Sequence, residues 1–157
     1  QGKTTFAFIG DNGDHAPEFK ARFTGYYRTL LAHGLDKNSS QFDAISTEDA
    51  GSEAIRGLIE AGELPQAIVC ASDLIAMGAL RALRQAKIKV PDDVAVVGYD
   101  NIAVSAYTTP ALTTVQQNTK LAGELLVSAL LKAINNEEVD DYLMPAEVIV
   151  RQSCGSQ

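Results

Sequence analysis

The sequence predicts an α/β protein with a mostly parallel sheet flanked by helices. Short apolar, β-prone runs alternate along the chain with longer segments of helical periodicity. Such alternation requires crossover connections between parallel strands. Of the 157 residues, 46% are hydrophobic and 21% are charged. This composition is typical of an ordinary globular domain that builds its own core.

The first strand and the first helix are predicted near the N-terminus. Residues 5–9 are continuously apolar, as in a strand that is buried on both faces. In residues 17–33 apolar side chains recur at steps of three and four, which predicts an amphipathic helix. Gly34 follows the last apolar position and is expected to end this helix.

Two more strand–helix units follow. A brief second strand is predicted at residues 42–45, and residues 46–49 then supply capping and acidic residues for a helix that ends near Gly62. Residues 67–71 form another continuous apolar run, which predicts a third buried strand. A third helix is predicted over residues 72–86.

The remaining elements complete the pattern. Residues 94–97 predict a fourth strand, which Gly98 ends. Leucines and an isoleucine at helical spacing predict a fourth long helix over residues 121–134. Residues 142–151 predict a closing strand.

Several classes of function are disfavoured by the composition and by missing motifs. Lys and Arg number 13 against 20 Asp and Glu, a net charge of −7, so the chain is not expected to bind DNA by itself. No apolar run is long enough for a membrane span. No dinucleotide, P-loop or nucleophile-elbow motif occurs.

Neither a metal nor a cofactor is predicted. His15 and His33 have no His, Cys or carboxylate at the spacing of a zinc site. Cys70 and Cys154 belong to no paired motif, so we expect two free thiols in a reducing compartment, with a long-range disulfide as the alternative.

Polar residues at the ends of the predicted strands are the candidate site, because parallel sheets bind ligands there. Asp100 follows the fourth strand, where its carboxylate could accept hydrogen bonds from a sugar or polyol, or could cap the next short helix. Asp73 follows the third strand, and a helix cap is its favoured role. Ser72 could point into the same crevice. Arg22 could clamp hydroxyl groups or a carboxylate there, or lie on a solvated helix face.

The third predicted helix is apolar on nearly every side. Its apolar residues surround the helix axis and include Leu74, Ile75, Met77, Ala79, Leu80, Ala82 and Leu83. Arg81 is one of its few long polar residues. A helix of this kind is buried on two sides. One side would cover the sheet. The other would form a homodimer interface or lie under a neighbouring helix.

Five stretches of the sequence resemble the effector-binding domain of LacI/GalR-type bacterial transcription regulators. They occur in the order found in that family and extend over nearly the whole chain. They are residues 22–26, 67–83, 88–101, 107–117 and 147–154.

This resemblance implies a periplasmic-binding-protein-like type I fold of two α/β lobes around a ligand cleft, preceded by an N-terminal helix-turn-helix. Residues 1–112 and 141–157 would form the C-terminal lobe. Residues 113–140 would carry a helix that packs on the N-terminal lobe. The chain resembles neither that first lobe nor the DNA-binding head, so residues 1–157 are expected to be a fragment of the effector-binding domain.

The resemblance also assigns roles to the candidate residues. Arg22 and Asp100 match positions that contact the effector in the family. Ser72 matches a position that touches the ligand in some relatives, whereas Asp73 matches one with a mainly structural role. Ser46 occupies a position where relatives often carry an aromatic ring that stacks on the effector, so stacking is in doubt here.

Subunit contacts in the family lie on the third helix and on the loop near Tyr107, which favours the homodimer. The residues predicted at this interface are Leu74, Met77, Leu80, Arg81 and Tyr107.

The predicted function is the ligand-sensing portion of a cytoplasmic LacI-type transcriptional regulator that is not an enzyme. A small, sugar-like effector would control operator binding through a helix-turn-helix outside these residues. One alternative is a periplasmic sugar receptor. Another is a flavodoxin-like phosphoacceptor or enzyme that uses Asp73 or Asp100. It would need more carboxylates or a lysine in the crevice, and no lysine follows a predicted strand after Lys3.

Overall fold

A parallel sheet lies at the centre of the structure, a computed structural model that describes residues 2–11, 13 and 16–156. Its four strands are arranged in the order β2-β1-β3-β4, and every neighbouring pair is parallel. The strands are β1 (Phe6–Ile9), β2 (Ser39–Phe42), β3 (Ala67–Cys70) and β4 (Ala95–Val97).

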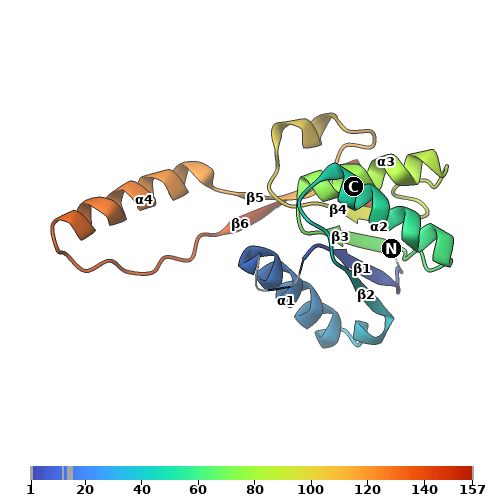
Figure 1. Ribbon diagram of the computed structural model, residues 1–157, viewed down its shortest axis with the longest axis horizontal. Helices are drawn as coiled ribbons and strands as arrows, with labels where there is room; N and C mark the ends of the chain where they lie inside the picture. The colour runs from blue at the N-terminus through green and yellow to red at the C-terminus, as the bar shows by residue number, and fades with distance from the viewer. Residues whose placement is uncertain (1, 12, 14–15, 157) are drawn as a thin grey trace.

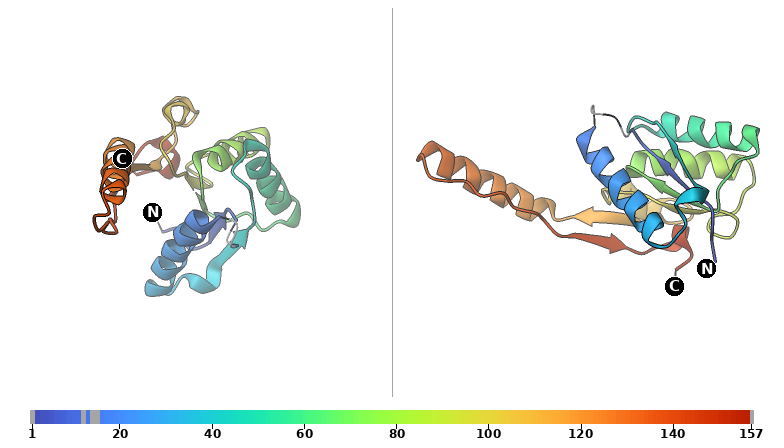
Figure 2. Two further views of the ribbon diagram at one scale, coloured as in Figure 1. Left: turned by 60° about the vertical axis from the view of Figure 1, so that its left-hand side comes forward. Right: turned by 90° about the horizontal axis from the view of Figure 1, so that it is seen from below.

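Helices cover both faces of this sheet (Figures 1 and 2). Helix α1 (Pro17–Ala32) lies on one face, and α2 (Glu48–Ala61) and α3 (Asp73–Gln85) lie together on the other. The predicted α/β class, a parallel sheet flanked by helices, is confirmed. The prediction that the second helix ends near Gly62 is also confirmed, because Gly62 is the C-cap of α2 and adopts the left-handed conformation at φ 71°.

The core forms where the continuous apolar runs were predicted. Phe8 and Ile9 in β1 are fully buried. The Phe8 ring meets Phe23 and Tyr26 of α1, with ring centroids 5.4 and 5.6 Å apart. Cys70 is buried in β3 and is a free thiol, as is Cys154, so the prediction of free cysteines is confirmed.

The second strand lies earlier in the chain than predicted. It was expected at residues 42–45, but β2 pairs with β1 from Phe6 opposite Ser39 to Ile9 opposite Phe42. This strand is at the sheet edge, where backbone pairing with β1 sets its position. The polar residues Ser39 and Ser40 therefore enter the sheet although they carry no strand pattern.

A two-stranded antiparallel ribbon extends away from the sheet and carries the last long helix (Figure 1). It consists of β5 (Thr114–Gln117) and β6 (Ala146–Ile149), joined through α4 (Thr119–Ile134). The closing strand predicted at residues 142–151 is shorter than expected. Strand β5 was not predicted, because its sequence Thr-Val-Gln-Gln becomes a strand only by pairing with a segment about thirty residues later.

Helix α3 receives its second cover from α2. Gly51 of α2 and Gly78 of α3 make the close approach possible: a Cβ atom at Gly51 would lie 2.1 Å from the Ile75 carbonyl oxygen, and one at Gly78 would lie 1.8 Å from that of Glu48. The neighbouring-helix alternative therefore accounts for most of this burial. Leu80 is only 6% exposed, so its predicted place at a subunit interface is corrected to the core.

Part of the predicted interface remains on the surface. Tyr107 is 84% exposed and Leu74 is 37% exposed, and Met77 is half-buried. The Arg81 side chain pairs with Asp49 at 2.8 Å.

Candidate functional site

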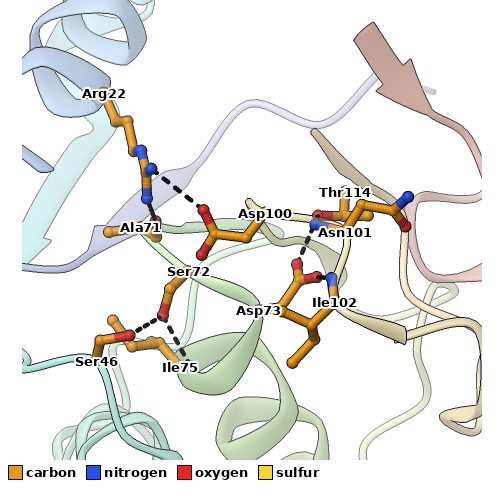
Figure 3. A network of polar contacts seen from close by, with 10 residues as sticks. All are labelled: Arg22, Ser46, Ala71, Ser72, Asp73, Ile75, Asp100, Asn101, Ile102 and Thr114. Atoms are coloured by element: carbon orange, nitrogen blue, oxygen red, sulfur yellow. Dashed lines mark hydrogen bonds and ion pairs between the residues drawn. The ribbon is translucent and has the colours of Figure 1, made fainter. Parts of the chain in front are cut away.

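Polar side chains from four segments gather at the carboxyl edge of the parallel sheet (Figure 3). Arg22 comes from α1, Ser46 precedes α2, Ser72 follows β3 and Asp100 follows β4. The prediction that these residues share one edge of the sheet is confirmed. Their contact with a ligand stays a prediction.

Polar and aromatic contacts hold Arg22 over this edge. Its Nη2 lies 3.2 Å from Asp100 Oδ1, and its Nη1 donates to the Ala71 carbonyl oxygen. The guanidinium carbon lies 3.7 Å from the centre of the Tyr99 ring, a cation–π contact. The Arg22 side chain is only 15% exposed, so the alternative of a solvated helix face is wrong.

Asp100 is presented by an unusual backbone. Its φ is 110° and that of Asn101 is 52°, values that non-glycine residues rarely adopt. The following 3-10 helix η2 (Ala103–Tyr107) has Ile102 as its N-cap, with no side-chain cap hydrogen bond. Asp100 is therefore not the cap of this helix. Its carboxylate faces Arg22 instead.

Burial raises the pKa of the Asp100 carboxyl. The Arg22 charge opposes this shift, and the charges of Asp73 and Glu18 add to it. The Asp100 side chain is 35% exposed, and among the described residues only Arg22 makes a side-chain hydrogen bond to it. Its other oxygen can thus accept a hydrogen bond from a molecule in the crevice.

Ser46 and Ser72 form a hydroxyl pair beside the ion pair. Ser46 Oγ donates to Ser72 Oγ at 2.8 Å. Ser72 is also the N-cap of α3 and accepts from the Ile75 N–H at 3.3 Å. Ser72 is buried and Ser46 is exposed, so Ser46 is the member of the pair that solvent or a ligand can reach.

Asp73 does not cap α3, the role that its position favoured, but supports the loop after β4 from inside the fold. Its side chain is fully buried, and it accepts from Thr114 Oγ1 at 2.5 Å and from the Ile102 N–H at 2.9 Å. Because Ser72 caps α3, the prediction of Asp73 as its cap is wrong. A Cβ atom at Gly98 would lie 2.3 Å from Asp73 Oδ1, so the glycine leaves room for this carboxylate.

Asp73 also belongs to the candidate ligand-binding residues at the strand ends. Its side chain is 0% exposed, which argues against contact with a ligand. Burial raises its pKa, while hydrogen bonds from Thr114 and Ile102 and the Arg151 charge oppose the shift. The carboxylate links the end of β4 to the start of β5.

Sequence reasoning overlooked Tyr99 and Arg151 as parts of the site. Tyr99 provides the ring under Arg22. Arg151 donates from Nη2 to Asn101 Oδ1 at 2.7 Å. Both residues lie within the motifs at 88–101 and 147–154. However, no local sequence pattern predicts the hydrogen bond between Arg151 and Asn101, which are 50 positions apart.

An apolar cavity of about 700 Å³ lies next to the ion pair, between α1 and the sheet. Phe6, Phe8, Val69 and Tyr99 line it, together with Arg22. Asp100 and the two serines do not line it. The ion pair and this apolar cavity therefore share Arg22.

No metal centre is formed by the part of the chain that the structure describes. Within residues 2–11, 13 and 16–156, no three His, Cys, Asp or Glu side chains are grouped to hold a metal ion. His33 is exposed, and its Nδ1 lies 2.8 Å from the Thr29 carbonyl oxygen. His15 lies outside the described residues. None of the described helices is long and apolar enough to cross a membrane.

Comparison with known proteins places the fold and the sequence in one family. Residues 1–154 match the family described as the periplasmic binding protein-like domain. The HTH-type transcriptional regulator RegA of Clostridium saccharobutylicum is 36% identical over 158 residues, which cover 98% of this chain and 47% of RegA. The HTH-type transcriptional repressor PurR of Aliivibrio salmonicida (strain LFI1238) is 31% identical over 137 residues, which cover 85% of this chain and 41% of PurR.

A solved structure shows the same arrangement of elements. The lac repressor bound to ONPG in its repressed state superposes with a TM-score of 0.89 at 25% identity, over 97% of this chain and 46% of that chain. The chain thus spans about half the length of the curated relatives it matches.

Proposed function

This chain belongs to the periplasmic binding protein-like domain family, and from that membership we propose that it is the effector-sensing portion of a LacI-type transcriptional regulator. Its curated relatives RegA and PurR are HTH-type transcriptional regulators. The observation that carries the proposal is the Arg22–Asp100 pair, 3.2 Å apart at the carboxyl edge of the sheet. Open α/β sheets bind their ligands at this edge.

The effector is a small sugar or sugar derivative. Asp100 offers a carboxylate oxygen as an acceptor, Arg22 offers charged donors, and Ser46 offers an exposed hydroxyl group. A molecule with several adjacent hydroxyl groups can satisfy all three, because each hydroxyl both donates and accepts. Charge-assisted hydrogen bonds to Asp100 and Arg22 would contribute most of the affinity.

The effector acts on DNA binding through a separate part of the protein. The chain carries a net charge of −7, which disfavours phosphate contacts. Operator DNA is bound by a helix-turn-helix outside residues 1–157, and RegA and PurR are described as HTH-type proteins. The same relatives favour a cytoplasmic regulator over a periplasmic receptor or an enzyme.

A homodimer forms through the exposed side of α3 and the loop at η2. Leu74, Met77, Arg81 and Tyr107 contribute to this interface, whereas Leu80 is buried in the core. The exposed Val104 on η2 adds apolar surface to the same region.

The ribbon connects sensing to regulation. Residues 113–140 pack on an N-terminal lobe, while residues 1–112 and 141–157 form the C-terminal lobe. An effector between the lobes favours one closure state, and it shifts DNA affinity only by its different affinity for the two states.

A thermal-shift screen tests this proposal. The full-length gene product is screened against monosaccharides, disaccharides and nucleobases, since a compound at 100 times its Kd stabilises the native state by about 2.7 kcal/mol. We expect a sugar to raise the melting temperature. Asp100→Asn should weaken its binding roughly 10- to 100-fold, because a hydrogen bond to a charged group is lost.

Asp92→Asn is the matched control, because Asp92 is exposed and lies far from the crevice in the loop before β4. It should respond as the native protein does. The proposal is contradicted if no sugar stabilises the protein, or if Asp100→Asn and Asp92→Asn bind the sugar equally well.

A further inference from the structure

We propose that Arg151 is a positioning residue that holds Asp100 in its effector-binding geometry by anchoring Asn101. The role of Asp100 in this statement rests on the function proposed above. The role of Arg151 rests on a set of hydrogen bonds around residues 100–102 that no local sequence pattern reveals.

The backbone at Asp100 and Asn101 requires support from its surroundings. Both residues have positive φ, 110° and 52°, and neither is glycine. Such conformations are unfavourable for L-residues and persist only where the neighbouring structure holds them. The direction of the Asp100 carboxylate therefore depends on contacts made by residues beside it.

Three consecutive backbone N–H groups are each held by a different partner. The Asp100 N–H donates to the Val115 carbonyl oxygen at 2.9 Å, and the Asn101 N–H donates to Thr114 Oγ1 at 3.2 Å. The Ile102 N–H donates to Asp73 Oδ2 at 2.9 Å. Two of these partners lie in β5, so the ribbon itself supports the turn.

The Asn101 side chain is fixed at both ends. Its Nδ2 donates to Gln116 Oε1 at 2.8 Å. Its Oδ1 accepts from Arg151 Nη2 at 2.7 Å and from Ser105 Oγ at the longer distance of 3.4 Å. The bond from Arg151 is charge-assisted and short, so it is the strongest restraint on this side chain.

Arg151 is itself well anchored. Its Nη1 donates to the Leu112 carbonyl oxygen at 2.7 Å and to Ser105 Oγ at 3.1 Å, and its backbone N–H donates to Thr113 Oγ1 at 2.8 Å. The planar guanidinium donates to Leu112, Ser105 and Asn101 at once from two nitrogens held in a fixed fork, a geometry that a lysine ammonium lacks. No hydrogen bond joins Arg151 to Asp100, so its influence passes through Asn101.

This arrangement ties the site to the ribbon. Arg151 lies shortly after β6 (Ala146–Ile149), and Thr114 begins β5 (Thr114–Gln117). A displacement of either strand relative to the sheet would move a partner of Asn101. The position of Asp100 and the position of the ribbon are therefore coupled.

Amide hydrogen exchange measured by NMR on the 157-residue chain, without any effector, tests the proposal. Arg151→Met should accelerate exchange of the Asn101 and Ile102 amides about tenfold or more, because a charge-assisted hydrogen bond is lost. Amides of β1 and β3 should change less than about twofold. Arg84→Met, which removes the same charge from the exposed last turn of α3, should leave residues 100–102 unchanged.

A double variant separates positioning from a general effect on stability. Asn101→Ala alone should reproduce the local acceleration, and Arg151→Met combined with it should add nothing further. Arg151→Lys is the milder variant if Arg151→Met does not fold. It should accelerate exchange of the same amides by a smaller factor.

The proposal is overturned if exchange at residues 100–102 is unchanged. It is also overturned if all amides accelerate equally, or if the effects of the two substitutions multiply. These rates do not depend on an effector, so failure of the sugar screen and failure of this proposal are distinguishable.

Discussion

Asp73 and Asp100 follow neighbouring strands of the same sheet, yet they differ in accessibility and partners. Asp73 is fully buried and bonded to Thr114 and Ile102. Asp100 is partly exposed and paired with Arg22. Burial raises the pKa of both carboxyls. At the residue scale, the surroundings of each carboxylate thus decide whether it supports the loop or faces the crevice.

The raised pKa of Asp73 predicts a specific pH dependence of stability. Between the ordinary aspartate pKa of about 3.9 and the raised value in the fold, the native state binds more protons at this site than the unfolded state. The contribution of Asp73 to the free energy of unfolding should therefore fall as pH rises through this window.

The measurement is urea unfolding of the native chain and of Asp73→Asn from about pH 3.5 to pH 7. The difference in the free energy of unfolding, native minus variant, should decrease with rising pH. Asp92→Asn, at an exposed aspartate, is the control. A difference for Asp73→Asn that stays constant with pH would contradict the prediction.

At the scale of elements, caps and small residues determine where the helices lie. Thr47 and Ser72 cap α2 and α3 through their side chains, and Gly51 and Gly78 let these helices approach closely. The sequence allows two covers for the second apolar side of α3, a partner subunit or a neighbouring helix. The packing shows that α2 provides most of this cover. The proposed subunit contacts can therefore involve only the α3 residues that α2 leaves exposed, such as Leu74.

Two glycines of α2 should respond oppositely to alanine. Gly51→Ala should lower the free energy of unfolding by roughly 1–3 kcal/mol, since its Cβ would lie 2.1 Å from the Ile75 carbonyl oxygen. Gly57→Ala meets nothing within 4 Å and should raise it by about 0.5–1 kcal/mol, because alanine favours a helix. Chemical denaturation measures both, and the prediction fails if both substitutions act in the same direction.

At the scale of the whole molecule, the sheet with its helices and the projecting ribbon are built differently (Figure 1). The sheet and its helices contain the buried core. Helix α4 has no buried residue, and Leu126 and Leu130 are 71% and 60% exposed. An apolar face of this kind marks an interaction surface or a site of association.

The isolated chain should therefore associate through α4. Leu126→Glu combined with Leu130→Lys should reduce concentration-dependent association in sedimentation velocity, because it replaces exposed apolar surface by an i,i+4 ion pair. The free energy of unfolding should change by less than about 0.5 kcal/mol, since both side chains are already exposed. Ser128→Glu on the same helix is the control, and equal association of all three proteins would refute the role of α4.

The sequence by itself determined the alternation of strands and helices, the ends of most helices, and the candidates Arg22 and Asp100. These features depend on local periodicity, capping residues and continuous apolar runs, which are present in short segments. The resemblance to a family added the expectation of a two-lobed architecture and the direction of the functional prediction.

Only the tertiary structure decided the position of β2, the pairing of β5 with β6, the internal role of Asp73 and the link from Arg151 to Asn101. Each depends on groups that are far apart in the chain: Thr114 is 41 positions from Asp73, and Arg151 is 50 from Asn101. The propensities of neighbouring residues do not predict such pairs. The physical reason is that backbone and side-chain hydrogen bonds between distant segments form only when the packed sheet brings their partners together.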